Sequence, residues 1–278
     1  MVVGSWAPDA VNGLSPNRCA ADVERARGLG QTQGSVNCGS HTTPTLTMPP
    51  LMQTLRIENE HGRQLALEVM RAIYRDEKNW VQADENLVAR EEITDPNISW
   101  FVVICDGRPA GVLRVLYEPP VDLYHSYGMK FLDQGQDVEA LLRRSRIAEV
   151  GRFAVLPEHR RGVLVAVALM RAAARETVER EFSHYITDVF EGEKHSPYEF
   201  HTRVMGFQLI ATHDTGELNC PNRRLTMLLD IRSTYWRLRA EKSWVFRYLT
   251  EGWEPSLHEL MQEPACPAAL VLAPATAL

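Results

Sequence analysis

Apolar and polar residues alternate along the middle of the chain in short blocks of strand length. Residues 99–105 and 110–117 are rich in β-branched and aromatic residues, and the turn sequence Asp106-Gly107-Arg108-Pro109 separates them, so they predict a β-hairpin. Further runs of strand length lie at residues 153–156, 184–190, 208–212 and 225–231. The pattern therefore predicts a sheet of short strands.

Segments with helical spacing lie between these strands. Leu65, Val69 and Ile73 fall on one face of a first helix, and Asp84 is a candidate N-cap for a second helix at residues 84–92. Helices are also predicted at residues 138–146, 163–174 and 233–249. Because strands and helices alternate along the chain, we expect an α/β (α+β) fold.

The two ends of the chain lack this periodicity. Gly, Ser, Thr, Asn and Pro dominate residues 1–53, and such a composition cannot bury enough surface to offset the entropy of ordering. We therefore expect a disordered N-terminal tail at 1–53 and one folded domain at 54–231. An amphipathic helical extension at 232–262 and a loose Ala- and Pro-rich tail at 263–278 complete the predicted organisation.

Composition and charge narrow the classes of function. The 278 residues carry a formal net charge of −6, so no basic field favours a nucleic-acid partner. No apolar run approaches the roughly 20 residues of a membrane span, and no secretory signal is evident, so we expect a cytoplasmic protein. The five cysteines have neither metal-ligand nor redox spacing, which predicts no metal and a reducing compartment. Contact with a membrane surface and the oligomeric state stay open.

The most informative stretch runs from residue 149 to residue 170. A short apolar run ends at Pro157, the basic turn His159-Arg160-Arg161-Gly162 follows, and a helix begins near Val163. Free backbone N–H groups at a helix N-terminus favour an anion, and arginines add charge-assisted hydrogen bonds. The stretch therefore predicts a phosphate site, although a buried strand and helix joined by a solvated basic turn would look similar.

This stretch resembles the GNAT superfamily of acyltransferases. The sequence Glu149-Val-Gly-Arg152-Phe-Ala-Val is most similar to the acyl-homoserine-lactone synthases and the N-acyl amino acid synthases. The resemblance implies a central mixed, mostly antiparallel β-sheet flanked by helices. Val163 and Val165 stand where the commonest GNAT loop has small residues. The donor therefore stays open between acyl-CoA and an acyl carrier protein thioester.

The resemblance also implies the roles of individual residues. Glu149 would be the base that deprotonates the acceptor amine, Arg152 would orient the acceptor's carboxylate or lactone or else stabilise Glu149, and His201 would protonate the leaving thiolate. The expected donor-binding residues are Phe153, Ala154, Val155, Arg160, Arg161, Gly162 and Val163, with backbone N–H groups of 153–155 as oxyanion donors. The expected acceptor-binding residues are Arg114 and Tyr127, the latter from the long loop 118–135.

Each of these residues also has a simpler interpretation. Glu149 could be an ion-pair partner, Arg114 a strand arginine that points to solvent, and His201 a polar surface residue. The acidic residues Asp76, Glu77, Asp84 and Glu85 are further acceptor-site candidates, or else line a solvated helix face. The basic residues of the helix at 233–249 are expected to flank a face packed on the core; the alternative is a docking face for a carrier protein or a membrane.

Three functions fit these observations. The first is an N-acyltransferase of the N-acyl amino acid or homoserine-lactone synthase type, with a small-molecule amine as acceptor and an acyl carrier protein as a candidate partner. The homoserine-lactone branch would also require S-adenosylmethionine. The second is a small-molecule N-acetyltransferase that uses acetyl-CoA. The third is a module that binds an acyl thioester without turnover.

Overall fold

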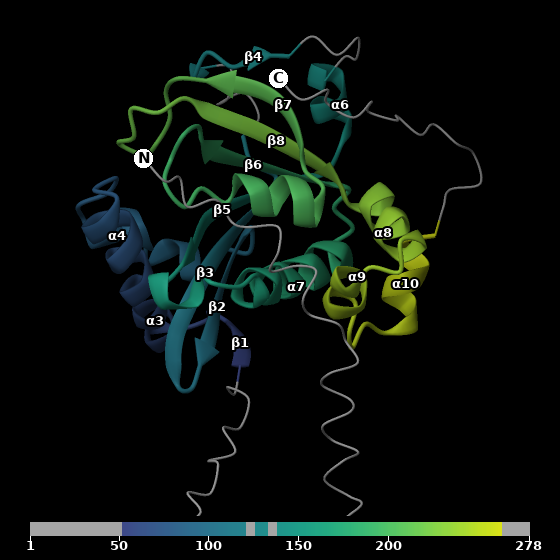
Figure 1. Ribbon diagram of the computed structural model, residues 1–278, viewed down its shortest axis with the longest axis horizontal. Helices are drawn as coiled ribbons and strands as arrows, with labels where there is room; N and C mark the ends of the chain where they lie inside the picture. Colours follow the sequence, from purple (N-terminus) through teal and green to yellow (C-terminus); the bar gives the residue numbers. More distant parts are fainter. Residues whose placement is uncertain (1–51, 121–125, 133–137, 263–278) are drawn as a thin grey trace, which may run out of the picture.

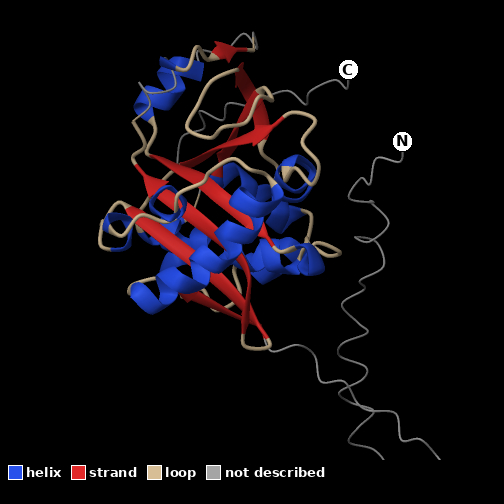
Figure 2. Cartoon of the chain, turned by 90° about the vertical axis from the view of Figure 1, so that its left-hand side faces the viewer, coloured by secondary structure: helices blue, strands red, loops and turns tan. Residues whose placement is uncertain are grey.

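A single eight-stranded sheet forms the centre of the molecule, with strand order β1-β2-β3-β5-β6-β8-β7-β4 (Figure 1). A computed structural model describes residues 52–120, 126–132 and 138–262 of the chain. Neighbouring strands are antiparallel except for the parallel pair β5–β6. Helices pack against the strands (Figure 2). The predicted mixed, mostly antiparallel sheet flanked by helices is therefore confirmed.

The N-terminal half of the domain forms one side of the sheet and the helices that cover it. Its elements are β1 (Met52–Arg56), α3 (Glu60–Met70), the π-helix η1 (Arg71–Glu77), α4 (Asp84–Leu87), η2 (Glu91–Ile93), β2 (Ile98–Cys105) and β3 (Arg108–Tyr117). The predicted hairpin is confirmed as β2–β3. Strand β1 begins at Met52, inside the segment predicted as a tail; residues 1–51 and 263–278 lie outside the described residues.

The second half completes the sheet and adds three C-terminal helices. Its first elements are β4 (Lys130–Phe131), α6 (Val138–Arg144), β5 (Ile147–Val155), η3 (Pro157–His159), α7 (Leu164–Glu179) and β6 (His184–Phe190). The π-helix η4 (Phe200–Met205), β7 (Gln208–His213), β8 (Arg224–Asp230), α8 (Ile231–Ala240), α9 (Trp244–Leu249) and α10 (Pro255–Leu260) follow. Gly206 ends η4 with a φ of 89°, which fits the left-handed helix C-terminus predicted there.

The parallel pair β5–β6 separates after three residue pairs, the last of which joins Glu149 and Ile186. Beyond this point the two strands, both fully described, form no further ladder pairs with each other. On its other edge β5 stays paired to β3 as far as Val155. The sheet is therefore split between β5 and β6, and β5 runs out of the split into the basic turn and α7.

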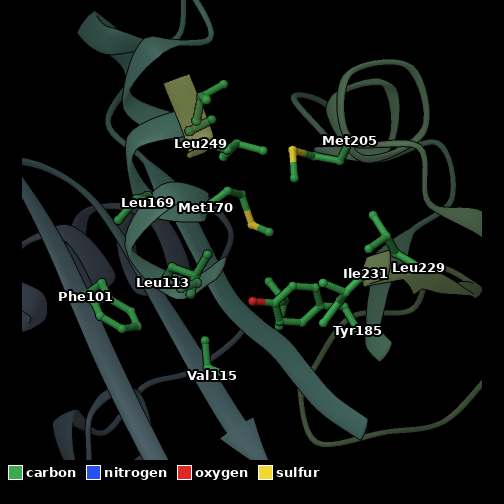
Figure 3. Close-up of a cluster of buried hydrophobic side chains, with 14 of the residues drawn as sticks. Phe101, Leu113, Val115, Leu169, Met170, Tyr185, Met205, Leu229, Ile231 and Leu249 are labelled. Atoms are coloured by element: carbon green, nitrogen blue, oxygen red, sulfur yellow. The ribbon is translucent and has the colours of Figure 1, made fainter. Parts of the chain in front are cut away.

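Three apolar clusters lie among the described residues, and the two larger ones hold the sheet between its helices. In the larger one, Leu169 and Met170 of α7 pack with Leu113 of β3 and Tyr185 of β6 (Figure 3). The smaller one joins α3 to the opposite face of β2 and β3, so α3 and α7 lie on opposite sides of these strands (Figure 1). Burial of apolar area on both faces stabilises the sheet by about 25 cal/mol per Å² removed from water.

The C-terminal helices contribute to the larger cluster. Its buried members include Tyr235, Leu238, Val245, Leu249 and Leu257. The single helix predicted at 233–249 is wrong, because the chain leaves α8 through Lys242, which has a φ of 50°. Ser243 then caps α9 by accepting a hydrogen bond from Val245 N at 3.2 Å. The prediction that aromatic residues of this region pack on the core is confirmed.

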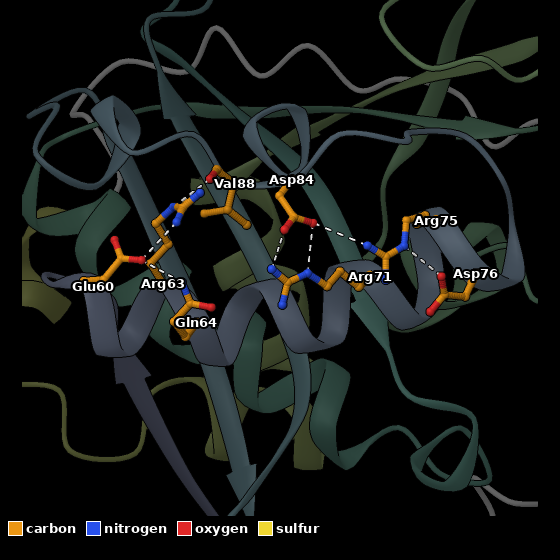
Figure 4. A network of polar contacts seen from close by, with 8 residues as sticks. All are labelled: Glu60, Arg63, Gln64, Arg71, Arg75, Asp76, Asp84 and Val88. Carbon is orange, nitrogen blue, oxygen red and sulfur yellow. Dashed lines mark hydrogen bonds and ion pairs between the residues drawn. The ribbon is translucent and has the colours of Figure 1, made fainter.

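The region at 84–92 also differs from its prediction. It consists of α4 and the 3-10 helix η2 instead of one helix, and Ala83 occupies the N-cap position of α4. The Asp84 carboxylate instead accepts hydrogen bonds from Arg71, with 2.9 Å between Arg71 Nε and Asp84 Oδ1 (Figure 4). Asp76 likewise pairs with Arg75, so these two acidic candidates stabilise the surface of α3 and η1. None of the helices among the described residues is long and apolar enough to cross a membrane.

Candidate active site

Two pockets meet where β5 and β6 separate. The first, here called the Arg160 pocket, has a volume of about 90 Å³ and is lined by residues 150–155, Arg160, Phe200 and His201 among others. The second, the Glu149 pocket, has a volume of about 170 Å³ and is lined by Arg114, Tyr127, Glu149, His213 and Glu217 among others. Both pockets share Tyr74, Val150, Gly151, Arg152, Asp188 and Phe190. A group bound in one pocket can therefore reach a group bound in the other.

Glu149 and Arg114 face each other in the Glu149 pocket. Arg114 Nη2 donates to Glu149 Oε1 at 3.3 Å, and Arg114 Nη1 donates to Glu92 Oε1 at 3.1 Å. Burial alone would lower the pKa of Arg114, but the charges of Glu149 and Glu92 raise it above its ordinary value. The interpretation of Arg114 as a solvent-facing residue is wrong, because its side chain is 8% exposed. Glu149 is an ion-pair partner of Arg114, which also orients its carboxylate toward the split.

Arg152 lies at the junction of the two pockets in a strained backbone conformation. Its φ is 49°, a left-handed value that is uncommon for a residue with a side chain and is often found at functional sites. Its Nη2 donates to Glu217 Oε2 at 3.1 Å, and its guanidinium lies 5.8 Å from the Tyr74 ring centre. Its buried Nη1 has no hydrogen-bond partner within the described part of the chain. Arg152 can therefore accept an anionic ligand without losing Glu217.

The basic turn lies beside the Arg160 pocket at the start of α7. Arg160 donates to Val155 O at 2.7 Å and to both carboxylate oxygens of Glu77 at 3.0 and 2.7 Å. Arg161 and Gly162 are exposed. Val163 at the N-cap position provides no side-chain hydrogen bond to the first N–H groups of α7. The side chain at the N-cap position therefore leaves these N–H groups to other acceptors, and the anion site expected here stays a prediction.

Val165 stands where many GNAT loops have a small residue, and the structure shows what accommodates it. A Cβ added to Gly111 of β3 would lie 2.7 Å from Val165 Cγ1. The absent side chain at Gly111 therefore makes room for the larger Val165. Strand β3 therefore accommodates the larger side chain, and the turn itself stays exposed.

His201 lies inside the protein beside the Arg160 pocket. Its ring is 5.5 Å from Phe153, 5.5 Å from Phe200 and 4.9 Å from Phe207, centre to centre. Burial lowers the pKa of His201 to about 3, so the imidazole is neutral at physiological pH. Neither ring nitrogen has a hydrogen-bond partner among the residues described. The interpretation of His201 as a surface residue is wrong, and its role toward a leaving thiolate stays a prediction.

Tyr127 lines the Glu149 pocket and contacts a second histidine, His213. Its ring stacks on His213, with 5.9 Å between ring centres and 5° between the planes. Burial raises the pKa of the Tyr127 hydroxyl, and the negative charges of Glu217 and Glu149 raise it further. Tyr127 is therefore placed to contact a ligand in this pocket, and its predicted role in acceptor binding stays a prediction.

The sequence analysis missed charged or titratable residues of the Glu149 pocket and its ion pairs. They are Glu92, Asp188, His213 and Glu217, and the arginine Arg224 and the tyrosine Tyr74 of the same lining were missed as well. Asp188 could have been found, because it is the one carboxylate in the otherwise apolar and β-branched run at 184–190. His213 and Glu217 come from the end of β7 and the following loop, which meet Asp188 and Arg152 only through the sheet topology. Among the described residues, no group of three or more His, Cys, Asp or Glu side chains is placed to hold a metal ion.

Comparison with known proteins identifies the family of the chain. Residues 66–223, more than half of the chain, match the sequence profile of the family described as N-acyl amino acid synthase FeeM. The structure of FeeM, an N-acyl amino acid synthase from uncultured soil microbes, superposes with a TM-score of 0.52 and 14% sequence identity. The match covers 72% of this chain and 99% of FeeM. No curated protein matches the chain in a sequence search.

Two further solved structures have lower similarity. One is a putative acetyltransferase of the GNAT family from Desulfovibrio desulfuricans, with a TM-score of 0.46, 12% identity, and coverage of 65% of this chain and 99% of that one. The other is an aminoglycoside 6′-N-acetyltransferase complexed with coenzyme A, with a TM-score of 0.46, 11% identity, and coverage of 65% and 97%.

The split parallel pair and the family match define the class of protein. The chain is a GNAT-type N-acyltransferase, and it is therefore an enzyme. More narrowly, it belongs to the N-acyl amino acid synthase FeeM family.

Proposed function

We propose that this enzyme moves an acyl group from an acyl-CoA or acyl carrier protein thioester to the amine of an amino acid or a related small molecule. One observation carries the proposal. The Arg160 pocket, next to the basic turn, joins the Glu149 pocket, which contains a carboxylate and two arginines, at the split between β5 and β6. The Arg160 pocket suits a thioester donor with its phosphates, and the Glu149 pocket suits an acceptor with an amine and an acid group.

On the donor side, the phosphates would bind the N–H groups at the start of α7, with Arg160, Arg161, Gly162 and Val163 around them. Arg160 would exchange at least part of its contact with Glu77 for phosphate oxygens. Phe153, Ala154 and Val155 lie on the part of β5 that is not paired with β6. Their backbone N–H groups on that edge would stabilise the oxyanion of the tetrahedral intermediate.

On the acceptor side, Arg152 would bind the acid group of the acceptor through its unpartnered Nη1. Arg114 would hold Glu149 in place, and Glu149 would accept a proton from the attacking nitrogen, directly or through a water molecule. The C–N bond forms first, which gives the tetrahedral intermediate; the C–S bond then breaks as the intermediate collapses, and the leaving thiolate takes up one proton. The products are an N-acyl amine and a free thiol, with no covalent enzyme intermediate.

The burial of His201 limits how it can act on the leaving group. With a pKa of about 3, the imidazole carries no extra proton to give at neutral pH. A neutral ring still has one N–H group. We therefore expect His201 to donate a hydrogen bond to the thiolate sulfur. The proton that the thiolate takes up would come from a water molecule or from the protonated base.

The volume of the Arg160 pocket favours a second candidate. At about 90 Å³ it is small, and a narrow acyl site would suit transfer of an acetyl group from acetyl-CoA to a small-molecule amine. A longer acyl chain would require rearrangement of the apolar and aromatic side chains at the wall, such as Phe153 and Phe200, which stack with 5.6 Å between ring centres.

The proposal is tested by comparing bacterial cells that express the full chain, Glu149→Ala or Glu158→Ala. Glu158 is an exposed carboxylate in the turn before α7 and serves as the matched control. Lipid extracts are analysed by mass spectrometry. We expect new N-acyl amines with the wild type and the control, and none with Glu149→Ala. Short N-acetyl products alone would favour the second candidate. Absence of any N-acylated species, followed by no turnover of purified protein with acyl-CoA and an amine panel, would contradict the proposal.

A further inference from the structure

A second carboxylate lies across the split from Glu149. In β6, Val189 belongs to the large cluster beneath α7, so its neighbour Asp188 points to the other face of the sheet. In β5, Val150 belongs to the same cluster, so Glu149 also points to that other face. Both carboxylates line the Glu149 pocket, and Asp188 lines the Arg160 pocket as well. Two carboxylates thus border the place where the two substrates would meet.

Asp188 is held by His213 in one orientation. His213 Nε2 lies 3.0 Å from Asp188 Oδ2, and His213 Nδ1 lies 2.8 Å from the carbonyl oxygen of Thr215. A carbonyl oxygen only accepts hydrogen bonds, so Nδ1 carries a proton and donates to Thr215. The contact of Nε2 with Asp188 Oδ2 then fixes the carboxylate relative to the ring. The Tyr127 ring covers His213, whose side chain is 1% exposed.

The other oxygen of Asp188 is free to bind a ligand. Oδ1 is buried and has no hydrogen-bond partner among the described residues. A buried carboxylate oxygen without a donor is costly unless a ligand or water molecule supplies one. The whole side chain is 27% exposed and lines both pockets. Oδ1 is therefore an unused hydrogen-bond acceptor beside the junction of the donor and acceptor sites.

We infer that Asp188 Oδ1 binds the amino group of the acceptor and that His213 is the positioning residue that orients Asp188. This inference rests on the proposed function and specifies its acceptor as an amino acid that is bound through both its amino group and its acid group. Its nitrogen lies between Asp188 and Glu149, and its acid group lies on Arg152. Asp188 holds the nitrogen through an N–H···O bond. Glu149 takes one proton from the ammonium group before the nitrogen attacks, and the proton that the nitrogen loses after attack goes to the leaving thiolate.

Charge in the pocket favours this assignment. The charged or titratable side chains that line it together with Asp188 are Tyr74, Arg114, Tyr127, Glu149, Arg152, His213, Glu217 and Arg224. Arg114 is engaged by Glu92 and Glu149, Arg152 by Glu217, and Arg224 by the carbonyl oxygens of Asp214 and Leu218. Asp188, by contrast, keeps an oxygen without a protein donor, as an ammonium site requires.

Binding measured by calorimetry on the full chain tests the inference without turnover. The probes are L-leucine and L-phenylalanine, each paired with 4-methylpentanoate or 3-phenylpropanoate, which keep the skeleton and the acid group but lack the amine. We expect the wild type to bind at least one amino acid more than about tenfold tighter than its deaminated partner. Asp188→Asn removes that preference. Asp214→Asn, which loses a carboxylate from an exposed neighbouring loop, keeps it.

Steady-state N-acylation supplies the second readout. We expect Asp188→Asn to lower kcat/KM for the amine about 100-fold, the size expected for loss of a hydrogen bond between charged groups, with an unchanged KM for the acyl donor. His213→Gln, which can still donate to Asp188, should raise KM for the amine with a smaller effect on kcat and should shift the acid limb of the pH–rate profile. His213→Ala should have the larger effect.

The outcomes separate this inference from the proposed function. If the wild type acylates amines and a folded Asp188→Asn variant keeps the wild-type kcat/KM and amine preference, the inference is wrong while the function stands. If Asp188→Asn does not fold, the His213→Gln measurements decide, because a purely structural pair would leave the pH profile and the amine preference unchanged. If the wild type neither binds amino acids nor acylates them, both are overturned.

Discussion

Arg114 Nη2 lies 3.3 Å from Glu149 Oε1, across the antiparallel pair of β3 and β5. The ladder places Arg114 opposite Gly151, two residues beyond Glu149, so the arginine reaches the carboxylate diagonally. The absent side chain at Gly151 leaves the space between them open, since a Cβ there would lie 3.0 Å from Glu149 Oε1. This pair places the carboxylate beside the point where the sheet splits.

Removing the arginine should destabilise the fold. Arg114→Met leaves the carboxylates of Glu92 and Glu149 partly buried and without their shared cation, and breaking one side of a buried ion network costs about 3 kcal/mol or more. Urea unfolding of the purified protein measures the loss. The variant Arg114→Met with Glu92→Gln and Glu149→Gln removes the uncompensated charges and should recover part of that stability. Equal stability of Arg114→Met and the wild type would show that the network contributes nothing to folding.

Gly151→Ala should separate stability from activity. The added methyl group meets the ends of the Glu149 and Arg114 side chains, which can move by a few tenths of an ångström, and does not meet backbone. We therefore expect the free energy of unfolding to change by less than about 1 kcal/mol, while kcat falls about tenfold because the carboxylate is displaced from the attacking nitrogen. Loss of stability with unchanged kcat would mean that the position of Glu149 does not limit the reaction.

The sequence predicts best those elements whose residues are contiguous in the chain. The hairpin β2–β3, the strand β6 and the turn between β5 and α7 follow from periodicity and turn residues alone. The site was predicted less completely, because its ion pairs join residues far apart in sequence. Arg152 and Glu217 meet only when β7 and β8 fold back beside β6, and this pairing is set by tertiary topology. His201 shows the same limit, since its burial depends on Phe153 and Phe207.

Glu217→Gln should strengthen acceptor binding. Glu217 Oε2 is 3.1 Å from Arg152 Nη2 and its side chain is 51% exposed, so its negative charge disfavours an incoming acid group on the unpartnered Nη1 of the same arginine. Exposed ion pairs contribute up to about 1 kcal/mol, so KM for the acceptor should fall by up to about fivefold. Asp214→Asn on the same loop is the charge-matched control, and KM for the acyl donor should not change. A higher KM for the acceptor would show that Glu217 helps to orient Arg152 for binding.

His201 should make the stability of the protein depend on pH. In the folded state burial lowers the pKa of His201 to about 3, while in the unfolded chain it returns to its ordinary value of 6.5. Below pH 6.5 the unfolded state therefore binds a proton that the folded state does not, and stability falls as the pH is lowered toward 3. Each pH unit corresponds to about 1.4 kcal/mol, so the loss from this residue between pH 6.5 and 4.5 is about 2 kcal/mol.

His201→Leu isolates this contribution, because a leucine fits an aromatic and apolar site and does not titrate. Denaturant unfolding between pH 7 and pH 4.5 should show a shallower pH dependence for the variant. The pKa of His184 is also lowered by burial. His184 is present in both proteins, so the difference between their pH dependences reports on His201 alone. If the imidazole also donates a hydrogen bond to the leaving thiolate, kcat should fall by roughly 10-fold in the variant at every pH, since one such bond contributes about 1–2 kcal/mol. Identical pH dependence in both proteins would place the folded-state pKa of His201 near its ordinary value and the ring in contact with water. A stable variant with unchanged kcat would instead assign His201 to packing alone.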